Sequence, residues 1–207
     1  MPRMMYTDAE GELAVRMARG AIDAHVHRRS LPPIPLPASF ESECGAFVTI
    51  NTHPGKDLRG CIGYPNPFFP LAKALVKAAE GATEDPRFPP LSAEELDRVV
   101  VEVSVLTPPE LLAPRKPKQL PSMVRVGTDG LIAAQGPARG LLLPQLPVEW
   151  GWDAEEFLSQ TCMKAGLLPD AWLDPETRMY RFQAEVFTEL EPRGPVVRRV
   201  MSAHARP

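Results

Sequence analysis

Proline is the sequence feature that most constrains this chain. It accounts for 25 of the 207 residues, about 12% where about 5% is usual. Each proline fixes its own φ angle and removes a backbone N–H, so it ends helices and leaves the interior of sheets. Four prolines between Ser30 and Ser39 predict an extended, polyproline-like segment there. We therefore expect short helices and short strands throughout.

Length and charge limit the class of protein. The chain is 44% hydrophobic and 24% charged, which is typical of a globular domain. With 23 basic and 26 acidic residues the net charge is −3, which argues against nucleic-acid binding and against anionic membranes. No apolar run approaches the roughly 20 residues of a membrane-spanning helix. Three cysteines without C-x-x-C spacing predict neither a disulfide framework nor a metal site, and they favour a reduced, cytoplasmic protein.

Capping and alternation patterns place the main elements. A capping box at Thr7–Glu10 predicts a helix to about Arg29. Residues 46–51 and 58–63 read as two strands of a hairpin around a turn at 53–57. A second helix is expected from Asn66, with Pro67 in its first turn, to Gly81. Two more helices are expected, one starting at a second capping box at residues 92–95 and one running from a third box at 153–156 to Gly166. Further strands are expected over residues 99–106, 123–126, 131–134, 140–143 and 180–189.

Hairpins and short strands dominate this pattern, and no regular βαβ alternation occurs. The sequence therefore predicts an α+β fold with a mostly antiparallel sheet and flanking helices. We expect a single domain over residues 6–190. The arginine-rich segment 191–207 is expected to be a basic, flexible tail.

The segment Leu58–Gly63 (LRGCIG) carries the most distinctive chemistry. Cys61 lies between Gly60 and Gly63, which leave its backbone accessible to a substrate or to an anion. The neighbouring Arg59 is expected to lower the pKa of the thiol, which would make Cys61 a nucleophile or a reactive thiol. In the competing interpretation Cys61 is a small buried side chain in a tight hairpin, and the glycines serve a bulge.

Other candidates are less distinctive. Asp85 and Arg87 occupy a stiff, proline-rich loop, EDPRFPP, where they either order the loop or bind a ligand. Glu102 is a carboxylate within the valine-rich strand. It is either a proton-transfer group or simply part of the polar face of that strand. His53 lies in the hairpin turn, where it is either a base for Cys61 or simply exposed.

Several segments together resemble one known family. LRGCIG at residues 58–63 is similar to the signature of the AMMECR family, and EDPRFPPL at 84–91, VEVSVLT at 101–107, RGLLLPQ at 139–145 and EWGWDAEEFL at 149–158 follow in the family's order. TCMKAGL at 161–167 and YRF at 180–182 continue the match. The resemblance covers roughly residues 6–189.

This resemblance implies an α+β fold with a larger and a smaller lobe and a cleft between them, with the LRGCIG segment as the functional feature. Bacterial and archaeal members are described as protein A of the AmmeMemoRadiSam system, which implies a Memo-like protein and a radical-SAM enzyme as partners. It identifies no reaction and no cofactor. Two functions follow as hypotheses: an enzyme acting on a small molecule or peptide through Cys61, or a non-catalytic scaffold or substrate-binding partner in which Cys61 is structural.

Overall fold

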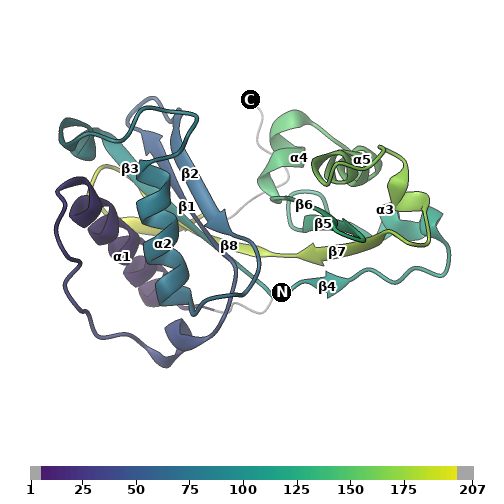
Figure 1. Cartoon of the computed structure of the whole chain (residues 1–207), viewed down its shortest axis with the longest axis horizontal. Coiled ribbons are helices and arrows are strands. Elements are labelled where there is room, and N and C mark those ends of the chain that lie inside the picture. The colour runs from purple at the N-terminus through teal and green to yellow at the C-terminus, as the bar shows by residue number, and fades with distance from the viewer. Residues whose placement is uncertain (1–5, 200–207) are drawn as a thin grey trace. The chain divides into compact units, whose positions relative to one another are not determined.

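The computed structural model describes residues 6–199, and it contains two compact units (Figure 1). Among these residues the first unit comprises 6–106 and 185–199, and the second comprises 107–184. Each unit has its own sheet, and the sheet pairings with a determined register are all antiparallel. The predicted α+β class with antiparallel sheets and flanking helices is therefore confirmed.

The first unit is built on a five-stranded sheet in the order β2-β1-β3-β8-β9. The strands are β1 (Ala46–Thr52), β2 (Leu58–Tyr64), β3 (Val99–Leu106), β8 (Ala184–Glu189) and β9 (Val196–Arg199). The predicted hairpin is present, because β1 pairs antiparallel with β2 as well as with β3. Strand β2 consequently lies at one edge of the sheet.

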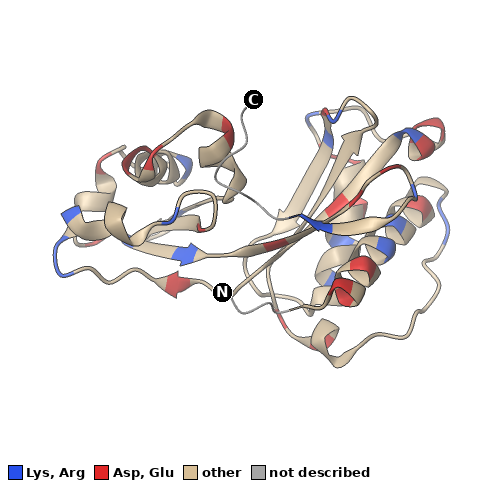
Figure 2. Ribbon diagram, turned by 180° about the vertical axis from the view of Figure 1, so that it is seen from behind, with Lys and Arg blue, Asp and Glu red and all other residues tan. Residues whose placement is uncertain are grey.

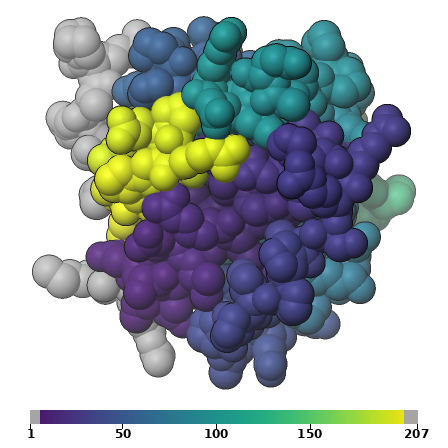
Figure 3. Space-filling view, turned by 90° about the vertical axis from the view of Figure 1, so that its left-hand side faces the viewer, coloured from purple at the N-terminus to yellow at the C-terminus, as the bar shows by residue number. Residues whose placement is uncertain are grey.

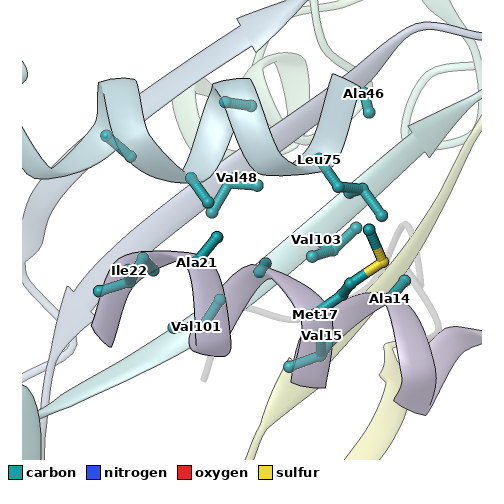
Figure 4. Packing of buried hydrophobic residues seen from close by; sticks show 14 of the residues in the cluster. Ala14, Val15, Met17, Ala21, Ile22, Ala46, Val48, Leu75, Val101 and Val103 are labelled. Carbon is teal, nitrogen blue, oxygen red and sulfur yellow. The ribbon is translucent and has the colours of Figure 1, made fainter. Parts of the chain in front are cut away.

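Two helices, α1 (Asp8–Val26) and α2 (Leu71–Thr83), cover one face of this sheet (Figure 1). The Thr7–Glu10 capping box forms as predicted, and α1 ends three residues before Arg29. Alternate residues of β1 and β3 point toward the helices and are fully buried with them (Figure 4). The labelled core comprises Ala14, Val15, Met17, Ala21 and Ile22 of α1, Leu75 of α2, Ala46 and Val48 of β1, and Val101 and Val103 of β3.

The predicted bounds of the second helix were wrong. It begins at Leu71, not after Asn66, because Pro70 acts as its N-cap and the Leu71 N–H donates to the Ser42 carbonyl. Nor does it end at Gly81. A side chain at that position would lie 3.0 Å from Ile62 of β2, so this glycine allows the helix to pack closely on the sheet.

Short 3₁₀ helices complete the first unit. The proline-rich segment after α1 has no regular secondary structure up to η1 (Ala38–Glu41), and the second capping box starts η2 (Ala93–Arg98). The sequence predicted a flexible tail from residue 191, but residues 196–199 form strand β9; the rest of that segment, 200–207, lies outside the described residues. In Figure 3 the yellow C-terminal segment lies against the purple α1, and Arg16 of α1 donates to the carbonyls of Arg193 and Gly194.

The second unit has a four-stranded sheet in the order β4-β7-β5-β6. Its elements are β4 (Glu110–Leu111), η3 (Pro117–Gln119), α3 (Leu120–Met123), β5 (Gly130–Gln135), β6 (Ala138–Leu142), α4 (Gln145–Trp150), α5 (Ala154–Lys164), η4 (Ala171–Leu173) and β7 (Arg178–Phe182). Helix α5 begins at the predicted Asp153 cap and packs on β5 and β6. Its core includes Phe157, Leu158 and Cys162.

Two strand predictions in this region were wrong. Residues 123–126 form no strand, because Met123 ends α3 and the Arg125 N–H donates to the Asp129 carboxylate in a turn. Residues 180–189 are two strands, β7 and β8, in different sheets. The break falls at Gln183, whose backbone N–H and carbonyl are both bonded to Thr107.

Charges of both signs are interspersed on the helices and loops (Figure 2). Among the described residues, no helix is both long and apolar enough to cross a membrane.

Candidate functional site around Cys61

Cys61 points away from the helices. Its neighbours Gly60 and Ile62 face α2, and side chains alternate across a strand. The Cys61 side chain therefore lies on the other face of the sheet, where it is half-buried. Cys44 and Cys162 are buried, so Cys61 is the most exposed of the three cysteines.

The two glycines of the motif contact the protein itself. A Cβ on Gly60 would lie 2.1 Å from the Ala82 carbonyl oxygen at the end of α2, and one on Gly63 would lie 2.2 Å from the Phe47 ring. Real Cβ atoms do not approach so closely, so both positions require glycine for packing. Their expected role in leaving room for a substrate stays a prediction.

Asp85 and Arg87 bind the backbone of Cys61. The Asp85 carboxylate accepts the Cys61 N–H at 2.9 Å, and the Arg87 guanidinium donates to the Cys61 carbonyl at 3.3 Å. Arg87 also makes an ion pair with Asp85 at 2.6 Å, which holds the pKa of the Asp85 carboxyl well below its usual range. The side chain of Asp85 is 1% exposed and that of Arg87 is 57% exposed. The loop thus satisfies an edge-strand peptide group and places a cation beside the thiol.

Thr49 is the nearest polar neighbour of the thiol. It pairs with Cys61 across the hairpin, and its hydroxyl donates to Cys61 Sγ at 3.2 Å. Burial raises the pKa of the Cys61 thiol, while the Thr49 hydrogen bond and the Arg87 charge oppose that rise. The thiol is therefore neutral at pH 7. This differs from the expectation of a lowered pKa, because desolvation outweighs the nearby cation.

Glu102 lies in the same cross-strand row as Cys61 and Thr49. Thr49 of β1 pairs with Cys61 on one side and with Glu102 of β3 on the other. Glu102 is 7% exposed, and Arg199 of β9 donates to its carboxylate at 3.0 Å. All eight residues of β3 are buried, so the Glu102 carboxylate faces other side chains and not solvent.

Arg59 and His53 make contacts elsewhere. The pairing shifts register between Ile50 and Asn51, so Arg59 is the extra residue of a β-bulge. Its guanidinium binds Glu95 at 2.7 Å, so the structure brings Arg87 rather than Arg59 to the thiol. His53 lies in the exposed turn, and its backbone N–H donates to the Arg98 carbonyl.

Sequence reasoning missed Thr49 and Arg199 at this site. The signal for Thr49 was a polar residue in the middle of a hydrophobic strand. Its partner could not be assigned, because the bulge sets the register. Among residues 6–199, no cluster of three or more histidine, cysteine or acidic side chains is arranged to hold a metal ion.

Comparison with known proteins places this site in a family context. The chain is 55% identical over 198 residues to a protein of Thermococcus kodakarensis, covering 93% of this chain and 96% of that protein. It is 57% identical over 183 residues to a protein of Methanothermobacter thermautotrophicus, covering 87% and 94%. The crystal structure of an uncharacterized protein from Pyrococcus horikoshii is similar with a TM-score of 0.88 at 50% identity, covering 95% of this chain and 99% of that one.

The family model described as AMMECR1 matches residues 15–187. This match includes the LRGCIG segment, the Asp85–Arg87 loop and Glu102, and it confirms the resemblance seen in the sequence. The chain therefore belongs to the AMMECR1 family.

Proposed function

We propose that this protein is a cytoplasmic enzyme that acts on a small molecule or a peptide through the thiol of Cys61. The observation that carries the proposal is the environment of that thiol: half-buried, hydrogen-bonded by Thr49, and beside a guanidinium that a buried carboxylate holds in place. A side chain serving only to fill the core needs none of these contacts.

Because the thiol is neutral, the mechanism of such an enzyme must include removal of its proton. Sulfur attacks as the thiolate, so the proton must leave Cys61 when the substrate binds. Glu102 is the candidate acceptor, because it lies in the same row across the sheet with Thr49 between them. Arg87 then stabilises the negative charge on sulfur. Asp85 positions both Arg87 and the Cys61 backbone.

A second function is favoured by a different observation. Because burial raises the pKa of the thiol, Cys61 is also suited to a structural role. In that case the protein is a scaffold or substrate-binding partner. For either function we propose a shared pathway with a Memo-like protein and a radical-SAM enzyme, on the basis of family resemblance.

Covalent capture distinguishes the two functions. Native protein is incubated with the small-molecule and peptide fractions of its source cells, and adducts are located by peptide mass spectrometry. The enzyme is expected to carry an adduct on Cys61 that is absent from Cys61→Ser. Cys44 and Cys162 serve as internal controls, because both are buried. If Cys61 resists both the fractions and iodoacetamide until the protein unfolds, the enzyme proposal is wrong and the binding role stands.

A further inference from the structure

A pocket of about 480 Å³ lies in the first unit, between the C-terminal ends of α1 and α2. This volume is in the range of small-molecule sites. The pocket is on the helix-covered side of the sheet, whereas Cys61 points to the other face. It therefore does not belong to the candidate site around the thiol.

The pocket is lined by charges of both signs. Glu80 and Glu84 are four residues apart along α2 and its C-cap, so they project from one side of that helix. Arg28 and Arg29 contribute two cations from the end of α1. His25 also lines the pocket, and its Nε2 is 3.0 Å from the Glu84 carboxylate. Such a lining favours a ligand that itself carries both charges.

Arg28 adopts a backbone conformation that an arginine rarely takes. The Arg29 N–H bonds to the Ala24 carbonyl and the Arg28 N–H to the His25 carbonyl, which is the Schellman pattern that ends a helix. In this pattern the residue in the position of Arg28 adopts a left-handed conformation, and glycine is the usual choice. Arg28 has φ +53°. The guanidinium of Arg28 therefore leaves the helix end at a residue whose position the helix-ending bonds fix.

We infer that this pocket binds a free α-amino acid. The carboxylate of the ligand pairs with Arg28, and its ammonium group pairs with Glu80 or Glu84. A guanidinium suits a carboxylate because it offers parallel N–H donors. The buried Leu91 and the aliphatic Ala21 provide an apolar surface for the ligand's side chain.

Thermal-shift measurements test this inference. The full chain is heated with each of the twenty L-amino acids at about 10 mM. A ligand at a hundred times its Kd is expected to raise Tm by several degrees. The N-acetyl and the amide derivatives of that amino acid, which lack the ammonium or the carboxylate, are expected to raise it far less.

Two variants locate the binding site. Arg28→Gly is expected to raise the Tm of the free protein by a few degrees, because glycine suits the left-handed position, and to abolish the ligand-induced shift. Lys56→Gly is the matched control, since Lys56 has φ +62° in the distant hairpin turn; it should keep the full shift. If no amino acid raises Tm, if Arg28→Gly keeps the shift, or if Lys56→Gly loses it as well, the inference is overturned.

Discussion

The carboxylate of Asp85 accepts the backbone N–H of Cys61 at 2.9 Å, across 24 residues of sequence. This bond fixes the edge strand at the thiol to the loop that follows α2. The same carboxylate accepts the N–H and the guanidinium of Arg87. One buried side chain therefore organises both the backbone of Cys61 and its nearest cation.

Asp85→Asn should lower the free energy of unfolding by about 2 kcal/mol at pH 7, since a buried acceptor loses its charge and its partners. The pKa of Asp85 in the folded protein lies well below its unfolded value of about 3.9. Its stabilisation is therefore complete above about pH 5 and is lost as the pH falls through 3.9 toward the folded pKa. Urea denaturation measures the free energy of unfolding of Asp85→Asn and of wild type at pH 7 and at pH 3. The two proteins should differ less at pH 3, and an equal difference at both pH values would contradict this account. Asp97→Asn, at an exposed ion pair, is the control.

Thr49→Val should slow the alkylation of Cys61. The Thr49 hydroxyl donates to Sγ and opposes the effect of burial on the thiol pKa. Its removal should raise that pKa further, because a hydrogen bond to the sulfur favours the thiolate. The rate with iodoacetamide at pH 8 should fall several-fold, whereas Thr49→Ser should react like wild type. A faster reaction in Thr49→Val would contradict this account, because valine keeps the methyl group of threonine and lacks only its hydroxyl.

Local signals in the sequence predicted much of the fold. The Thr7–Glu10 box, the hairpin of β1 and β2, and the Asp153 cap all depend on residues within a few positions of one another. The errors involve distant contacts. Gln183 ends a strand because Thr107 binds its backbone, and β9 forms because β8 offers it an edge.

The residues of the candidate site were likewise predicted only in part. Cys61, Asp85 and Arg87 were identified from unusual residues in stiff segments, and the structure brings them together. Arg59 was chosen because it is adjacent in sequence, but the bulge at that residue directs it to Glu95. Thr49 and Arg199 reach the row of Cys61 and Glu102 only through strand pairing, which the sequence does not specify.

Gly60→Ala should destabilise the protein by several kcal/mol. The added methyl would lie 2.1 Å from the Ala82 carbonyl oxygen, and a backbone atom cannot move aside without shifting α2. Gly136→Ala is the control, because that position has φ +55° with nothing within 4 Å and should cost only about 1 kcal/mol. Thermal and urea unfolding measure both variants. Similar losses in the two would show that the approach of α2 to β2 adjusts easily.

Arg19→Met tests a buried ion pair on which the first unit depends. Arg19 and Glu189 are 4% and 3% exposed; their side chains form an ion pair, and Arg19 also donates to the carbonyls of Leu96 and Val99. The Glu189 carboxylate in turn accepts the Val101 N–H at 3.0 Å. Removing the arginine leaves the buried carboxylate with only the half-exposed Arg16, 4.0 Å away, as a cation, which should cost about 3–5 kcal/mol.

The control is Arg16→Met on the same helix, whose side chain is 38% exposed, pairs with Glu12 at 3.3 Å and lies 4.0 Å from the Glu189 carboxylate. Because this second cation is solvated and more distant, its removal should cost less than about 1 kcal/mol. The double variant Arg19→Met/Glu189→Met separates charge from shape. If the cost of Arg19→Met comes from the buried carboxylate that it leaves behind, removing that carboxylate should restore part of the stability, although the Val101 N–H loses its acceptor. The single variant Glu189→Met is measured as well. If the double variant loses as much stability as Arg19→Met and Glu189→Met together, Arg19 stabilises the unit through its bonds to the Leu96 and Val99 carbonyls instead.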